Sequence, residues 1–202
     1  MKNRTEEIWT ALTPLIEELS LNDISRTLDT FNTHAESLLA SMRAALISCD
    51  QQAAALRHSG EKGETAYIAI SFLDSSYMTG AYCLRVDFYD DSFLTDIAEA
   101  CAYFSYARLI PYYRESVETI CTKASKRFIR FMDYEKDALA WKYKNEVLYK
   151  MALVVCTQCL QHPETTGFLP SLTVTDDCVF TFGRLFNDQQ FFLRMPKKTA
   201  EL

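Results

Sequence analysis

The chain has 202 residues, of which 49% are hydrophobic and 24% are charged, so its composition excludes a disordered chain. The formal net charge of −6 gives no general attraction to nucleic acid or to anionic membranes. Neither a Gly-x-Gly-x-x-Gly nor a Walker-type loop occurs, which argues against dinucleotide enzymes and P-loop nucleotide hydrolases.

The first sixty residues predict two helices that fold as a hairpin. The first helix begins at Asn3, and Pro14 predicts a kink or a restart inside it. Ser20 and Asp23 predict the cap of a second helix, which continues to about Arg57 and is about 50 Å long. One neighbouring helix cannot cover so long an element, so later helices or a second subunit must cover the rest. We expect a homodimer whose contact includes part of these two helices.

Two segments that are far apart in the sequence have the residue pattern of β-strands. Residues 65–90 predict two strands, and residues 178–195 predict a closing hairpin that turns at Asn187-Asp188. A lone hairpin is only marginally stable, so we expect the two segments to pair or adjoin. Phe180 and Phe182 share one face of their strand, and we expect this face to point into the core.

Helical patterns fill the sequence between these two segments. One helix opens at Asp90–Ser92, and its apolar positions continue to Phe104. Another begins or restarts at Pro111 and continues to about Met132, and a further helix spans about residues 134–160.

The complete pattern predicts an α+β fold. We expect about five helices, including one long N-terminal helix, around a small, mostly antiparallel sheet built from two hairpins. The length suits a single α+β domain over residues 1–202. In this domain a helical hairpin over residues 1–60 precedes the sheet and helices of residues 61–202.

The string Cys156-Thr-Gln-Cys159-Leu-Gln-His162 is the most motif-like in the chain. Two cysteines and a histidine at this spacing could bind zinc, and Cys178 could supply a fourth ligand. However, no second Cys-x-x-Cys pair exists, and the two cysteines lie near the C-terminal end of an expected helix, which disfavours a thiolate. We therefore favour packing in the core and expect no bound metal.

Four aspartates form a second candidate site. Asp87, Asp90 and Asp91 lie at the end of an expected strand, with Asp74 on the facing strand. Paired carboxylates can hold Mg²⁺ for phosphoryl chemistry. The alternative, which we favour, is that Asp90 and Asp91 cap the following helix while Asp87 faces solvent.

Four cations lie on one side of the helix that is expected to end near Met132. Their spacing of i, i+3, i+4 and i+7 forms one basic stripe, and no acid occurs between Glu118 and Asp133. Such a stripe can bind phosphate, RNA or an acidic partner, although charged helix faces most often serve only as solvated surface. The stripe consists of Lys123, Lys126, Arg127 and Arg130.

Aromatic side chains are dense before and at the start of this helix. Tyr106, Tyr112 and Tyr113 predict an aromatic-lined pocket or a protein interface, and the alternative is packing beneath the sheet.

These features together predict a binding or protein-interaction protein without catalysis of its own and without a cofactor. The sequence has no Gly-x-Ser-x-Gly motif, and we recognise no family in it. Its N-terminal residues have no apolar targeting segment, and its 7 cysteines mostly occupy apolar positions, so we expect a reduced, cytoplasmic protein that does not enter membranes. The expected partner is a second copy or another protein. Two alternatives remain: a metal-dependent phosphodiesterase or nuclease that uses the aspartates, and a phosphate- or RNA-binding module that uses the basic stripe.

Overall fold

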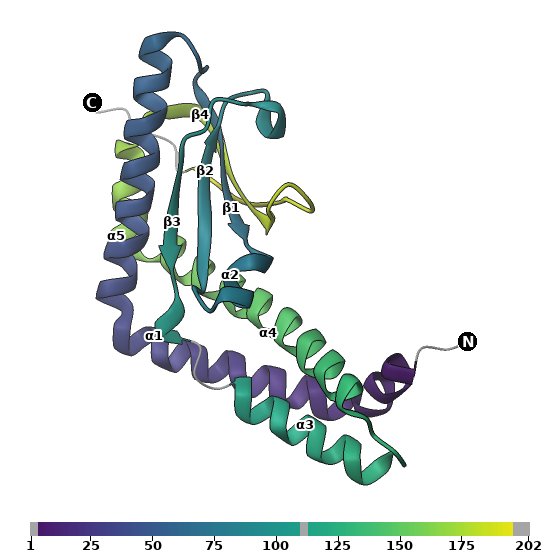
Figure 1. The fold of residues 1–202 in the computed structure, drawn as a ribbon. Helices are drawn as coiled ribbons and strands as arrows, with labels where there is room; N and C mark the ends of the chain where they lie inside the picture. The colour runs from purple at the N-terminus through teal and green to yellow at the C-terminus, as the bar shows by residue number, and fades with distance from the viewer. Residues whose placement is uncertain (1–3, 110–112, 196–202) are drawn as a thin grey trace. The chain divides into compact units, whose positions relative to one another are not determined.

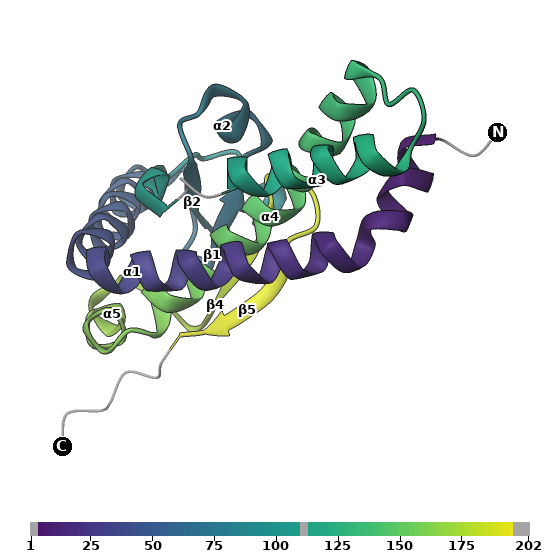
Figure 2. The ribbon, with the colours of Figure 1, turned by 90° about the horizontal axis from the view of Figure 1, so that it is seen from below.

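The computed structural model describes residues 4–109 and 113–195, except for the side chains of Ser76 and Tyr77. The chain divides into two compact units (Figures 1 and 2). The first unit comprises Met1–Thr33 and Arg108–Val155, and the second comprises His34–Ala107 and Cys156–Leu202. Two helices, α1 (Arg4–Ser59) and α4 (Asp133–Gln161), contribute residues to both units.

The first unit is helical. It contains the N-terminal part of α1, the helix α3 (Tyr113–Arg127) and most of α4, and α3 lies alongside α1 (Figure 1). Apolar side chains at helical spacing on all three helices form its core, because each helix buries one face against the others. They include Ile8, Leu12, Ile16, Phe31, Ile120, Ala124, Leu139 and Val147.

The N-terminal helix is one element rather than the two that the sequence analysis expected. It continues without interruption through Ser20 and Asp23, which were expected to cap a second helix. Both residues are buried, and the Asp23 carboxylate accepts hydrogen bonds from other helices rather than from the backbone N–H groups that a cap would satisfy. The expected break is therefore wrong because Asp23 has partners elsewhere in the first unit.

The second unit is built on a five-stranded sheet with the order β3-β2-β1-β4-β5. Only β1 and β4 pair in parallel, and the other neighbours are antiparallel. The strands are β1 (Thr65–Phe72), β2 (Cys83–Tyr89), β3 (Cys101–Ser105), β4 (Val174–Arg184) and β5 (Gln190–Arg194). The short helices are α2 (Asp74–Thr79), η1 (Phe93–Thr95), η2 (Ala107–Leu109, at the boundary of the units), α5 (Pro163–Phe168) and η3 (Leu169–Ser171).

One face of this sheet is apolar and supplies the core of the second unit. The register places Ile70 beside Val86 on one side and beside Phe182 on the other, and Ile68 beside Phe180. These side chains are buried, which confirms that the face of Phe180 and Phe182 points inward. The buried positions of α1 at Met42, Leu46, Cys49 and Ala53 belong to the same core, and the Cys49 thiol donates to the Val86 carbonyl oxygen at 3.3 Å.

The α+β class and the mostly antiparallel sheet are confirmed. The prediction that two hairpins make up the whole sheet is wrong in detail, because β3 adds a fifth strand. The segments 65–90 and 178–195 do pair, but through the parallel neighbours β1 and β4. The β4–β5 hairpin turns over residues 185–189, which include Asn187-Asp188.

The fifth strand, β3, lies where a helix was expected. Its backbone pairs with β2, with Arg85 opposite Tyr103. Its first residue is also held by the side-chain amide of Gln52, which donates to the Cys101 carbonyl oxygen at 2.9 Å and accepts from the Cys101 N–H at 3.1 Å. These bonds from distant parts of the chain outweigh the local helical pattern.

Replacing Gly183 by alanine should destabilise the second unit by about 1–3 kcal/mol. Gly183 lies in β4 where the hairpin connection crosses it, and an added Cβ would lie 2.7 Å from the backbone carbon of Asp188 and 2.8 Å from the Cα of Gln189. The connection would have to move, because backbone atoms cannot rotate away. Chemical denaturation measures the loss.

Gly167→Ala is the matched control for this substitution. An added Cβ at Gly167 meets no atom within 4 Å, and the residue lies in α5, where alanine is favoured over glycine. We expect this variant to be as stable as the wild type or slightly more so. Equal losses in the two variants would contradict the steric explanation.

Candidate functional site

A buried carboxylate connects the three helices of the first unit. Asp23 of α1 is 1% exposed. Its Oδ1 accepts a hydrogen bond from the Ser116 hydroxyl of α3 at 3.0 Å, and its Oδ2 accepts one from the Tyr143 hydroxyl of α4 at 2.7 Å. Both oxygens of the Asp23 side chain therefore accept hydrogen bonds from hydroxyl groups of other helices. Among the described residues, no cation forms a salt bridge with Asp23.

Tyr143 acts in this group as a hydrogen-bond donor. Burial raises the pKa of the Tyr143 phenol, and the hydrogen bond to Asp23 raises it further. The phenol therefore stays protonated at neutral pH and keeps donating to the carboxylate.

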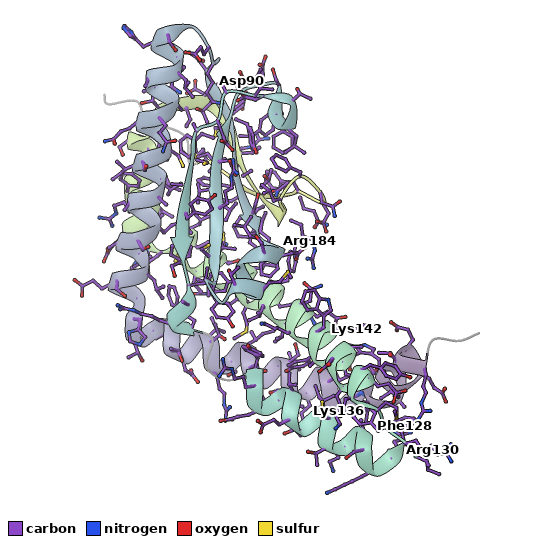
Figure 3. All side chains as sticks on the ribbon, viewed as in Figure 1. Asp90, Phe128, Arg130, Lys136, Lys142 and Arg184 are labelled. Carbon is purple, nitrogen blue, oxygen red and sulfur yellow. The ribbon has the colours of Figure 1, made fainter. Side chains whose placement is uncertain are left out.

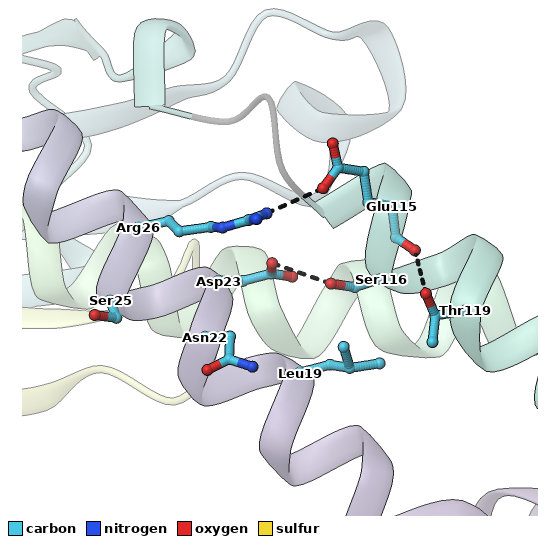
Figure 4. Close-up of a pocket in the computed structure, with 8 residues that line it drawn as sticks. All are labelled: Leu19, Asn22, Asp23, Ser25, Arg26, Glu115, Ser116 and Thr119. Carbon is cyan, nitrogen blue, oxygen red and sulfur yellow. Dashed lines mark hydrogen bonds and ion pairs between the residues drawn. The ribbon is translucent and has the colours of Figure 1, made fainter.

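A pocket of about 300 Å³ opens between α1 and α3 beside this carboxylate (Figure 4). We call it the Asp23 pocket. Asp23 and Ser116 are its buried residues, and the others are half-buried or exposed. The lining residues are Leu19, Asn22, Asp23, Ser25, Arg26, Glu115, Ser116 and Thr119.

An ion pair forms the rim of the Asp23 pocket. The Arg26 guanidinium donates to Glu115 Oε2 at 3.0 Å, and both side chains are at least half exposed (Figure 4). Such exposed pairs contribute little to stability, so this one can open at small cost. The described lining residues include no histidine or cysteine, and the Ser116 hydroxyl donates its hydrogen bond to the Asp23 carboxylate.

The structure distributes the four cations of the basic stripe over a helix and a loop. Lys123 and Lys126 are exposed on α3, and Arg127, at its last position, donates to the Ala11 carbonyl oxygen at 2.6 Å. The helix ends there, so Arg130 lies beyond it, exposed and with a left-handed backbone (φ 57°). Figure 3 shows Arg130 beside Phe128 at this end of α3.

Large apolar side chains are exposed in the same region, and the sequence analysis did not connect them with the basic stripe. Ile129 is 86% exposed and Tyr134 is 65% exposed, and Met132 and Trp141 are about half exposed. Tyr134 and Trp141 are seven residues apart on α4 and therefore share one face of that helix. The helix was expected to continue to about Met132, but α3 ends at Arg127. Residues 128–132 therefore lie in a loop and not on one face of a helix.

The three tyrosines singled out in the sequence do not form one site in the described residues. Tyr106 is buried in the second unit, and burial raises the pKa of its phenol. Tyr113 is buried in the first unit, where the Lys144 ammonium lies 5.5 Å from the centre of its ring. Tyr112 lies outside the described residues.

Two of the four aspartates are paired with arginines. Asp74 forms an ion pair with Arg184. Asp87 is buried, and its Oδ1 accepts from Arg85 Nε at 2.8 Å on the same strand. Asp87 therefore faces a guanidinium, not the solvent that alternation suggested.

The other two aspartates lie in the turn after β2. Asp90 accepts hydrogen bonds from the backbone N–H groups of Gly63 at 3.1 Å and Ser92 at 2.9 Å, and Asp91 is exposed. In the part of the chain that the structure describes, no three or more His, Cys, Asp or Glu side chains are grouped so as to hold a metal ion.

The cysteines of the motif-like string lie in the core of the second unit. Cys156, Cys159 and Cys178 are buried free thiols. Burial raises the pKa of Cys159 and Cys178 to about 12, and that of Cys156 well above its ordinary value. All three thiols are therefore protonated at neutral pH. His162 follows α4, and its Nδ1 accepts from the Glu164 N–H at the start of α5.

Comparison with family models, curated proteins and solved structures finds no match to this chain in any of the three. In the described residues no helix is both long and apolar enough to cross a membrane.

Proposed function

We propose that the chain is a binding protein without catalysis of its own, and that its first unit docks an acidic, partly apolar segment of another protein. The observation that carries this proposal is the surface formed by the end of α3, the following loop and the first turns of α4. We call it the docking surface. It consists of Lys123, Lys126, Ile129, Arg130, Met132, Tyr134 and Trp141.

The apolar part of the docking surface argues for a protein partner. Soluble proteins seldom expose several large apolar side chains together unless that surface binds something. Ile129 and Met132 flank Arg130 within four consecutive residues, and Tyr134 follows directly on α4. Aromatic residues, methionine and arginine are the residue types enriched where proteins bind one another.

The charge of the docking surface argues for an acidic partner. Its three cations have no acid between Glu118 and Asp133 to neutralise them, although the whole chain is acidic with a net charge of −6. None of the three side chains forms a salt bridge with a described residue. A partner that carries acids beside large apolar residues complements both features.

The separate partners of three of the four aspartates support binding over the phosphodiesterase alternative. Asp74 and Asp87 each face an arginine, and Asp90 accepts from backbone N–H groups. A catalytic Mg²⁺ would need these carboxylates to turn towards one another.

A displayed library of random dodecapeptides, selected on the immobilised protein, tests this proposal. We expect enrichment of peptides that combine Asp or Glu with large apolar residues. The double variant Lys126→Glu/Arg130→Glu should bind the selected peptides at least about tenfold more weakly, which equals about 1.4 kcal/mol. Binding to the wild type should weaken with salt.

The matched control is Arg108→Glu/Arg194→Glu, which changes the net charge equally at two exposed cations outside the docking surface. It should bind the peptides as the wild type does. Equal loss in both double variants, or tighter binding of single-stranded RNA than of any peptide, would contradict the proposal. So would a dimer in light scattering that the Lys126→Glu/Arg130→Glu variant dissociates, because a second copy would then occupy the surface.

A further inference from the structure

We propose that the Asp23 pocket binds a small organic cation, with an ammonium group of the ligand seated on the Asp23 carboxylate. This site is separate from the docking surface, and its ligand class follows from the charge, the size and the rim of the pocket.

The first reason is an unbalanced buried charge. Buried carboxylates are normally paired with a cation. Hydroxyl groups can satisfy the hydrogen bonds of a carboxylate, but they do not neutralise its charge. Asp23 has the hydroxyls of Ser116 and Tyr143 and, among the described residues, no salt-bridge partner. A carboxylate has about four acceptor positions, so about two remain for the N–H groups of a ligand.

The second reason is the space beside this carboxylate. A volume of about 300 Å³ is at the lower end of the range for small-molecule sites and exceeds the need of a single ion. The described residues also offer no group of three acidic, histidine or cysteine ligands here that would favour a metal. Leu19 can cover a short alkyl chain, and Asn22 and Ser25 add neutral polar groups.

The third reason is the second carboxylate at the rim. Glu115 is engaged by Arg26 at 3.0 Å, but the pair is exposed and can open. A ligand with two ammonium groups can bind Asp23 with one and replace Arg26 at Glu115 with the other. A diamine should therefore bind more tightly than a monoamine of equal length.

Calorimetric titration in amine-free phosphate buffer tests the site with four probes: 1,4-diaminobutane, butylamine, butanol and butyrate. We expect one bound diamine per chain, weaker binding of butylamine and no binding of butanol or butyrate. Asp23→Asn should weaken diamine binding at least about tenfold, because it removes the charge and keeps the shape. Circular dichroism shows whether this variant is folded.

Asp29→Asn is the matched control, since Asp29 is exposed on the same helix and does not line the pocket. It should bind the diamine as the wild type does. Arg26→Gln provides a second variant that keeps Asp23 and its partners intact. It should tighten diamine binding several-fold, because it removes a competing cation and frees Glu115.

Three outcomes would overturn the proposal: no diamine binding to the wild type at millimolar concentration, equal binding to the wild type and a folded Asp23→Asn variant, or weaker binding to Arg26→Gln. The Lys126→Glu/Arg130→Glu variant should retain diamine binding. If the proposed role of the docking surface proves wrong, the diamine titration is unaffected. The two proposals can therefore be contradicted separately.

Discussion

Replacing Phe182 by alanine should lower the free energy of unfolding by about 3–5 kcal/mol. The ring is 3% exposed on the apolar face of the sheet, and the register places it beside Ile70. Its centre lies 6.3 Å from that of the Phe192 ring on β5. Alanine removes these contacts and leaves a cavity that a sheet paired on both sides of β4 cannot close. Chemical denaturation followed by circular dichroism measures the loss.

Phe191→Ala is the matched control because it removes the same side chain from the neighbouring strand. Phe191 is 66% exposed, so its replacement should change stability by no more than about 0.5 kcal/mol. A loss below about 1 kcal/mol for Phe182→Ala, or equal losses for both variants, would show that the apolar face is not the core of the second unit.

Local patterns were sufficient to predict the core face of β4 but not the order of the sheet. Phe180 and Phe182 alternate with polar or smaller residues, and alternation alone identifies the face of a strand. The parallel pairing of β1 and β4 joins segments about 110 residues apart, as the contact of Ile68 with Phe180 shows. Nothing local to either strand specifies that register.

The strand β3 shows where a local pattern fails. The spacing from Phe93 to Phe104 resembles one face of a helix, yet Ile97 is almost fully exposed and Cys101–Ser105 is a strand. The bonds that decide the structure come from β2 and from Gln52, which is 49 residues earlier. Tertiary hydrogen bonds of this kind leave no signal in the residues that they hold.

The Asp23 pocket was missed for a different reason. Asp23 is separated by 93 residues from Ser116 and by 120 from Tyr143, so no motif could bring them together. The sequence did contain one indication of this contact. Asp23 lies at helical spacing between Ile16 and Phe31, on the buried face of α1. An acid at an inner helical position indicates a buried polar contact, but the sequence analysis interpreted it as a cap.

The ion pair of Arg85 and Asp87 carries the second large effect that we expect. Arg85→Met should destabilise the protein by about 3–5 kcal/mol at neutral pH, because it leaves the Asp87 carboxylate, which is 1% exposed, without its cation. Asp87→Asn in the same chain should restore most of the loss. Arg194→Met is the control: this exposed arginine lies 3.8 Å from Asp177, and its loss should cost less than about 1 kcal/mol.

The loss caused by Arg85→Met should depend on pH in a defined direction. Burial raises the pKa of Asp87 in the wild type in spite of the hydrogen bonds from Arg85, and removal of Arg85 should raise this pKa further. A carboxyl group whose pKa is higher in the folded than in the unfolded state favours folding most when protonated, below the unfolded value of about 3.9. Its contribution declines as pH rises through the folded pKa. Denaturation from pH 7 to pH 4 should therefore show the variant approaching the wild type as the pH falls. A loss that stays constant over this range, or that Asp87→Asn does not rescue, would mean that Arg85 acts through its packing or through its ion pair with Glu99 instead.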